Sequence, residues 1–182
     1  PGAAVAAGVV AFAIGSETSG SILTPSAYCG VTGLRPTYGL VSRHGAMALS
    51  WTLDKLGPMT RTADDAAIVL SAIAGADPAD ETCTGRKFPW SGPAVYKKPW
   101  RIAVPKGCVE KVQPAVRDNF EAALKAMGGA ITVTRDVEFP DQPWGPAVSA
   151  IVSAEGAAAF VDLLESGDVT KLRCPADHTG GY

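Results

Sequence analysis

The amino-acid sequence indicates an α/β protein with a mixed β-sheet flanked by helices. The apolar run at residues 9–14 has the length of a buried strand, and it leads through a Gly/Ser-rich loop into a short helical stretch. Residues 101–137 then follow the order strand, helix, strand. This order is typical of a crossover unit in an α/β sheet.

The N-terminal part divides into short elements. Residues 1–8 are Ala-rich and predict the end of a helix, and residues 9–15 predict a strand. A second short strand is expected at residues 31–36. It stops at Pro36 because the residue before a proline avoids the helical region.

Two helices in this part carry terminal signals. A short helix is predicted over residues 24–30, with Pro25 at its first position and Gly30 just past its end. A longer helix is expected to begin after Thr62. The Thr62 side chain can accept a hydrogen bond from the first turn, and Asp65 lies three residues on, as in a variant capping box.

The C-terminal part is predicted to contain a long loop followed by alternating elements. Prolines and glycines interrupt residues 76–99, so we expect a surface loop there. A strand at 101–104, a helix at 114–127, a strand at 130–137 and one Ala-rich helix at 144–165 follow.

Composition limits the function. The chain has 182 residues, of which 47% are hydrophobic and 19% charged, as in a globular domain with a proper core. With 16 basic and 18 acidic residues and no basic stripe, we expect neither nucleic acid nor a membrane surface as a partner. No apolar run is long enough to span a bilayer, and no signal peptide is evident.

The cysteines indicate a reducing compartment. The four cysteines are far apart and form no C-x-x-C pair, so we expect free thiols, a cytoplasmic location, and neither a zinc site nor any other metal or cofactor.

The loop Gly15–Ile22 carries the candidate chemistry. A loop of small residues between a strand and a helix can bring several backbone N–H groups to one point, and Ser21 lies beside them. This arrangement is typical of a serine nucleophile with an oxyanion hole. A flexible turn is the simpler interpretation. A phosphate loop and the elbow of α/β-hydrolases are disfavoured, because neither G-x-x-x-x-G-K-[ST] nor G-x-S-x-G occurs here.

Four motifs in order make the loop more specific, and with them the sequence resembles the amidase signature family. That family reads close to G-S-D-T-G-G-S-I-R-x-P, C-G, G-L-K-P-T and L-D-x-x-G-P-x-x-R. The corresponding segments are GSETSGSI at 15–22, CG at 29–30, GLRPT at 33–37 and LDKLGPMTR at 53–61. The similarity is strong over about residues 1–75 and looser over residues 101–137.

The resemblance implies an amidohydrolase that cleaves a small-molecule carboxamide through a serine acyl-enzyme. Family enzymes use a Ser–Ser–Lys triad, and the position that matches their nucleophile is Ser21. The matching oxyanion-hole N–H groups belong to Thr18, Ser19 and Gly20, with Ser21 itself as a further candidate.

The resemblance also implies that other residues of the triad lie outside this sequence. In the family, the middle serine precedes the segment that matches residues 1–8, and the lysine lies further upstream. We therefore expect residues 1–182 to be part of a single amidase domain, truncated at both ends and nearly inactive by itself.

Two alternatives to a free amidohydrolase remain. One is the amidase-type subunit of a multi-subunit amidotransferase, which makes ammonia from glutamine and passes it to a partner. The other is a catalytically dead scaffold. The expected partners are accordingly an amidotransferase subunit or a second copy of the chain.

Three residues depart from the family motif. Glu17, Ser19 and Leu23 stand where Asp, Gly and Arg are usual. Leu23 removes a guanidinium that could hold the acid, so the role of Glu17 is open.

Two other catalytic groupings are weaker. Ser21, His44 and Asp54 could form an ordinary serine triad, but His44 lies in a polar loop, where a solvated histidine is the default interpretation. The pattern Thr52-x-x-Lys55 is one substitution away from an S-x-x-K nucleophile pair, and chance matches to so short a pattern are common.

The remaining candidates are interpreted as structural. We expect Asp54 and Arg61 to form an ion pair or cap contacts, and Trp51 to be a packed aromatic rather than part of a pocket. Glu155 is expected to be a solvated or capping carboxylate, and His178 to lie at the surface.

Overall fold

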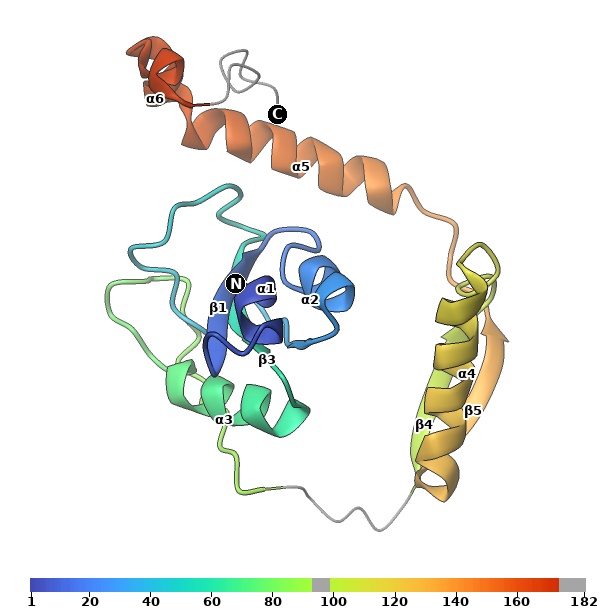
Figure 1. Cartoon of the computed structure of the whole chain (residues 1–182). Coiled ribbons are helices and arrows are strands. Elements are labelled where there is room, and N and C mark those ends of the chain that lie inside the picture. Colours follow the sequence, from blue (N-terminus) through green and yellow to red (C-terminus); the bar gives the residue numbers. More distant parts are fainter. Residues whose placement is uncertain (93–98, 174–182) are drawn as a thin grey trace. The chain divides into compact units, whose positions relative to one another are not determined.

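The computed structural model describes residues 1–92 and 99–173, which form two compact units (Figure 1). The first unit comprises Pro1–Gly92 and the segment from Trp144 onward, and the second comprises Pro93–Pro143. His178 and Cys174, which the sequence singled out, lie outside the described residues.

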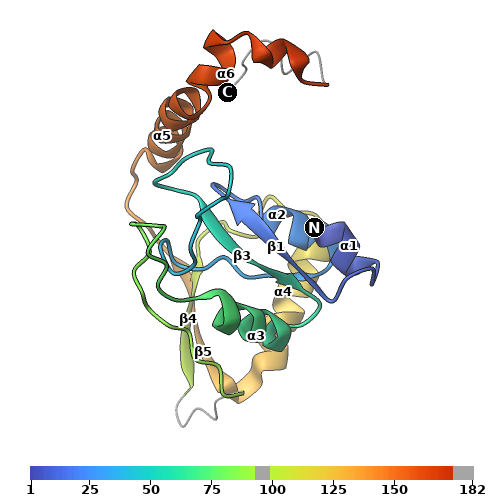
Figure 2. The same cartoon turned by 90° about the vertical axis from the view of Figure 1, so that its left-hand side faces the viewer.

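The first unit contains a three-stranded antiparallel sheet with the order β1-β3-β2 (Figures 1 and 2). Its strands are β1 (Phe12–Glu17), β2 (Thr32–Gly33) and β3 (Lys55–Thr60). The strand expected at 9–15 begins later, because β3 ends at Thr60, which pairs with Phe12. Residues before Phe12 have no partner strand among the described residues, and Val9 is exposed.

The central strand β3 was not predicted as a strand. Gly57 and Pro58 interrupt the sequence pattern, yet both are buried within β3. Gly57 faces Gly15 across the sheet, and a Cβ atom at Gly57 would lie 2.2 Å from the carbonyl oxygen of Leu34. The close approach of this backbone explains why glycine occupies the position.

Helices surround the sheet of the first unit. They are α1 (Gly2–Ala6), α2 (Leu23–Cys29), α3 (Ala63–Ile73), α5 (Trp144–Ala159) and α6 (Val161–Glu165), with a 3₁₀ turn η2 at Asp168–Lys171. The cap of α3 is confirmed, since the N–H of Asp65 donates to Thr62 Oγ1 at 3.1 Å. The end of α2 at Gly30 is confirmed too, but Pro25 is its third residue rather than its first.

The single helix expected at 144–165 is wrong in one respect. It is divided into α5 and α6, because Phe160 leaves the helical conformation with φ −115° and ψ 13°. The core of the first unit is built from apolar side chains that are almost fully buried, namely Val5, Ile22, Met59, Ala66 and Leu70.

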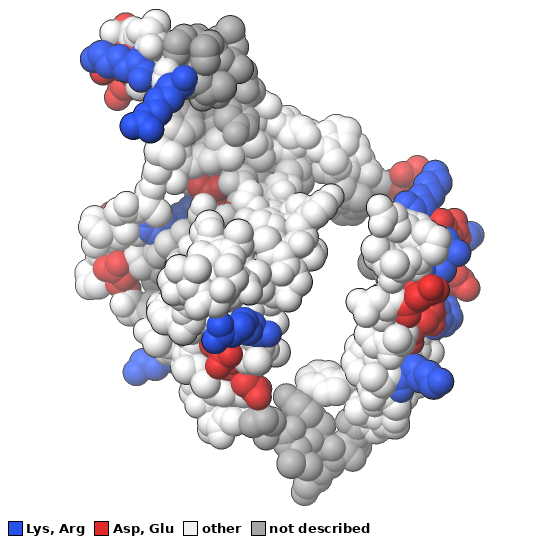
Figure 3. Space-filling model, viewed as in Figure 1, with Lys and Arg blue, Asp and Glu red and all other residues white. Residues whose placement is uncertain are grey.

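The second unit confirms the predicted crossover. Strands β4 (Trp100–Pro105) and β5 (Ile131–Val137) run parallel, joined by α4 (Pro114–Met127) and a 3₁₀ turn η1 (Gly128–Ala130). Its surface carries charges of both signs (Figure 3), including an ion pair of Arg135 with Glu121 at 2.6 Å. The parallel pair here and the antiparallel sheet of the first unit together confirm the mixed α/β expectation. In residues 1–92 and 99–173, no helix combines the length and apolar character needed to cross a membrane.

Candidate active site

Ser21 lies in the connection between the edge strand β1 and helix α2 (Figure 1). The strand ends at Glu17, and the helix begins at Leu23. Ser21 is exposed, whereas its neighbour Ile22 is 0% exposed and anchors the connection in the core. The local order of strand, loop and helix therefore presents the hydroxyl-bearing residue at the surface.

The residues before Ser21 form a tight turn. Thr18 and Gly20 are half-buried and Ser19 is exposed. Gly20 has φ +104°, which favours glycine, and its carbonyl oxygen accepts the N–H of Thr24 at 2.7 Å. The oxyanion-hole role expected for Thr18, Ser19 and Gly20 stays a prediction.

The Glu17 carboxylate holds this turn from inside. Glu17 is 1% exposed, and its Oε2 accepts the N–H groups of Ile22 at 2.8 Å and Leu23 at 3.0 Å. The N–H of Gly20 also interacts with the same carboxylate. Because these donors lie beyond the turn and the acid lies before it, Glu17 closes the loop that carries Ser21.

Arg35 supplies the charge that balances Glu17. Its Nη1 donates to Glu17 Oε1 at 3.1 Å. Burial raises the pKa of Glu17, but the N–H groups of Leu23 and Ile22, followed by the guanidinium, outweigh burial and hold that pKa below its ordinary value. The question left open by Leu23 is thereby answered. The acid is held by a guanidinium from the GLRPT segment and by the Leu23 backbone.

Asp54 fixes the start of the turn. Its Oδ1 accepts the Thr18 hydroxyl at 2.5 Å, and its Oδ2 accepts the N–H groups of Leu49 at 2.8 Å and Ser50 at 3.0 Å. Of the two expectations for Asp54, the cap contacts are confirmed. Among the described residues, no ion pair joins Asp54 to Arg61.

Lys55 also contacts the turn. Its Nζ donates to the carbonyl oxygen of Thr18 at 3.1 Å. Burial, and then the charge of Arg35, lowers the pKa of Lys55 below its ordinary value, and nearby carboxylates only partly oppose this. Thr52 donates instead to Glu155 at 2.7 Å, so the two residues of the suspected S-x-x-K pair contact different groups.

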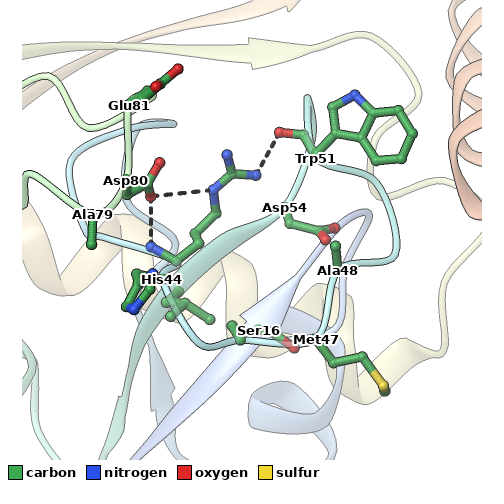
Figure 4. A pocket seen from close by; sticks show the side chains of 12 residues that line it. Ser16, His44, Met47, Ala48, Trp51, Asp54, Ala79, Asp80 and Glu81 are labelled. Carbon is green, nitrogen blue, oxygen red and sulfur yellow. Dashed lines mark hydrogen bonds and ion pairs between the residues drawn. The ribbon is translucent and has the colours of Figure 1, made fainter.

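A hollow of about 220 Å³ opens beside β1 and β3 (Figure 4). Its lining includes Ser16, Arg43, His44, Trp51 and Asp54, and it does not include Ser21. Trp51 thus faces a pocket, contrary to expectation, with 44% of its surface exposed. Among the hydrogen bonds of residues 1–92, none joins His44 to Asp54 or to Ser21, so nothing supports an ordinary serine triad.

Arg43 organises the wall of this hollow. Its Nη1 donates to the carbonyl oxygen of Trp51 at 2.5 Å, and its backbone N–H donates to Asp80 at 2.7 Å (Figure 4). Its guanidinium also lies 4.7 Å from the ring centre of Tyr38 and donates to Thr82 Oγ1 at 2.7 Å. One side chain therefore joins three loops around the opening.

Glu155 is not a solvated or capping carboxylate. It lies within α5 and accepts hydrogen bonds from Ser50 Oγ and from the backbone and hydroxyl of Thr52. The sequence offered no signal for this contact, because the partners are more than 100 residues apart.

Comparison with known proteins decides the family. The family described as Amidase matches residues 1–176. The chain belongs to the amidase family. The resemblance inferred from the four motifs is confirmed, and the solved structures that match the chain carry the same mixed α/β fold.

Several relatives of this amidase-family chain are glutamyl-tRNA(Gln) amidotransferase A subunits. Identity to the one from Lysinibacillus sphaericus is 43% over 166 residues, covering 90% of the chain and 34% of the relative. Identity to the one from Geobacillus kaustophilus is 44% over 160 residues, covering 86% and 33%. The chain spans about a third of the length of these relatives.

The solved structures that match include both kinds of enzyme, amidotransferase A subunits and amidases. The glutamyl-tRNA(Gln) amidotransferase chain of this kind from Thermotoga maritima matches with a TM-score of 0.79 and 38% identity, over 86% of this chain and 35% of its own. The peptide amidase of Stenotrophomonas maltophilia matches with a TM-score of 0.73 and 35% identity, over 97% and 37%.

Proposed function

We propose that this chain is part of the amidase-type subunit of a multi-subunit amidotransferase, in which Ser21 attacks the carboxamide of glutamine. Identity of 42–44% to several glutamyl-tRNA(Gln) amidotransferase A subunits supports this choice over a free amidohydrolase. The ammonia released would pass to a partner subunit rather than to solvent.

The observation that carries the chemical part is the closure of the 18–22 turn by Glu17. The N–H groups of Ile22 and Leu23 are committed to that carboxylate, so the oxyanion-hole donors are drawn from residues 18–21. The exposed Ser21 stands beside them. A turn held from inside is pre-organised, and each donor aimed at a developing oxyanion contributes about 2.7–4 kcal/mol of barrier lowering.

The proposed reaction is acyl transfer. The Ser21 hydroxyl gives up its proton and its oxygen bonds to the carboxamide carbon, which forms a tetrahedral oxyanion. Collapse of that oxyanion breaks the C–N bond, the nitrogen leaves protonated as ammonia, and an acyl-serine remains. Water then attacks the acyl carbon and returns the serine with free glutamate.

The proton acceptors for Ser21 are proposed to be the serine and lysine of the family triad, in the parent protein. A free serine hydroxyl is a poor nucleophile at neutral pH without such a base. The 182-residue chain by itself is therefore expected not to release ammonia from glutamine.

The test uses the full-length parent protein, expressed with its partner subunits. Ammonia release from glutamine should be detectable, Ser21→Ala should abolish it, and a fluorophosphonate probe should attach to Ser21, as peptide mass spectrometry would show. Absence of labelling in the unmodified protein would favour the dead-scaffold alternative.

A peptide amidase is the second candidate. The Stenotrophomonas maltophilia peptide amidase covers 97% of the chain, which is more than the Thermotoga maritima protein covers. Parallel assays of glutamine and of a C-terminally amidated dipeptide separate the two functions. Cleavage of the dipeptide amide without any partner subunit, and without glutaminase activity, would overturn the amidotransferase proposal.

A further inference from the structure

Glu155 of α5 is joined to the Ser50–Thr52 turn by three hydrogen bonds. Its carboxylate accepts the hydroxyl of the fully buried Ser50, the N–H of Thr52 at 3.2 Å and the hydroxyl of Thr52 at 2.7 Å. The two segments are 103–105 residues apart in the chain. A carboxylate with three donors from one turn fixes both the position and the orientation of that turn.

The same turn contacts the Asp54 carboxylate. Ser50 donates its N–H to Asp54 Oδ2, and Thr18 donates its hydroxyl to Asp54 Oδ1. A continuous path of hydrogen bonds therefore runs from Glu155 through Ser50 and Asp54 to Thr18, at the start of the loop that carries Ser21.

Backbone packing supports this connection independently. Gly156 is buried, and a Cβ atom there would lie 3.2 Å from Leu49 Cδ1 and 3.8 Å from the Leu49 carbonyl oxygen. The helix backbone thus approaches the same turn that Glu155 binds. Glu155 itself lies well inside α5, four residues before its last residue, so it does not cap the first turn of its own helix.

We propose that Glu155 is a positioning residue for the proposed amide cleavage, which holds the Ser50–Asp54 turn and, through Asp54, orients Thr18 in the oxyanion loop. This inference rests on the function proposed for Ser21. It assigns to α5 a role in the site that no sequence motif indicates.

Glu155→Gln in the full-length protein with its partner subunits tests the proposal. Glutamine has one acceptor oxygen, and its NH₂ group would face donors of the turn, so the turn should loosen while the fold persists. The rate of fluorophosphonate labelling of Ser21 and kcat for ammonia release should each fall about tenfold, because small misplacements of catalytic groups are costly. KM should change little, and Glu155→Asp should recover part of the rate.

Glu121→Gln is the matched control. It also removes a carboxylate that accepts two hydrogen bonds, those from Arg135, but it lies on α4 in the second unit. Its labelling rate should equal that of the unmodified protein. Equal labelling rates for Glu155→Gln and the unmodified protein would overturn the positioning role.

Hydrogen exchange keeps the two proposals distinguishable. Glu155→Gln should speed amide exchange in peptides that cover residues 18–22 and 49–54, whether or not Ser21 reacts. Accelerated exchange without labelling of the unmodified protein would support the connection while refuting the proposed function, and unchanged exchange at 18–22 would refute the connection. Should Glu155→Gln fail to fold, Thr52→Val removes one donor from the exposed side of the turn and should give the same pattern.

Discussion

Arg35 Nη1 lies 3.1 Å from Oε1 of Glu17, and this ion pair joins two motifs that are separate in the sequence. The carboxylate side chain is 0% exposed and the guanidinium side chain 49% exposed, so the cation covers a buried acid at the surface. The acid in turn binds the backbone beyond Ser21. The charge of the GLRPT segment therefore stabilises the GSETSGSI loop.

Arg35→Met should destabilise the chain by about 1 kcal/mol, because it leaves a buried carboxylate without its cation while the exposed side of the pair is screened by water. Urea unfolding followed by circular dichroism measures the change. In a double-mutant cycle with Glu17→Gln, the two losses should be less than additive. Strict additivity would show that the pair is not coupled.

The stability of the first unit should depend on pH through Glu17. A carboxyl whose pKa is lower in the folded than in the unfolded chain stabilises the fold above its unfolded value, here 4.5. It loses that contribution as the pH falls through the folded value. Glu17→Gln should therefore lower stability at neutral pH and flatten the decline below 4.5. Urea titrations across this range test it, and Glu121→Gln, which removes an exposed acid, should flatten the decline less.

Lys55→Met should impair the proposed catalysis more than the fold. In a trans peptide, the carbonyl of Thr18 and the N–H of Ser19 point in opposite directions, so the Lys55 contact with that carbonyl also orients the N–H. We expect kcat/KM for ammonia release by the full-length assembly to fall about tenfold. Lys55→Arg should recover part of it, and Lys125→Met on α4 should have no effect. Full activity of Lys55→Met would count against an oxyanion role for Ser19.

Thr62→Ala should cost about 1 kcal/mol, because the N–H of Asp65 loses its acceptor at the first turn of α3. Thr62→Ser retains a hydroxyl and should stay within a few tenths of a kcal/mol of the unmodified chain. Urea midpoints compare the three proteins. A Thr62→Ser variant as unstable as Thr62→Ala would show that the methyl group, and not the cap, matters.

Gly57→Ala should cost about 3 kcal/mol or more, since its Cβ atom would lie 2.2 Å from the backbone oxygen of Leu34 and 2.7 Å from Pro36 Cδ. Backbone cannot move aside as a flexible side chain can. Gly145→Ala is the control, because within the described residues nothing lies within 4 Å of its added methyl group. It should change stability by less than about 0.5 kcal/mol. Equal thermal midpoints for the two variants would contradict the packing of β3.

Local signals in the sequence were sufficient for several elements. The cap at Thr62, the start of α4 at Pro114 and the end of α2 at Gly30 all depend on neighbours within a few residues. The strand–helix–strand order of the second unit was likewise visible from periodicity. Position 21 was singled out by a motif, and the structure places it in an exposed loop between a strand and a helix.

Motifs and periodicity were enough to establish the family, the mixed α/β class and the loop that carries Ser21, because they are properties of neighbouring residues. The folded chain was needed to show that Lys55–Thr60 is the central strand, that Arg35 rather than residue 23 balances Glu17, and that Glu155 binds the turn at Ser50. Each of these depends on contacts between distant segments. A polar group that folding removes from water must find a partner, and that partner can come from any part of the chain, so no local pattern records it.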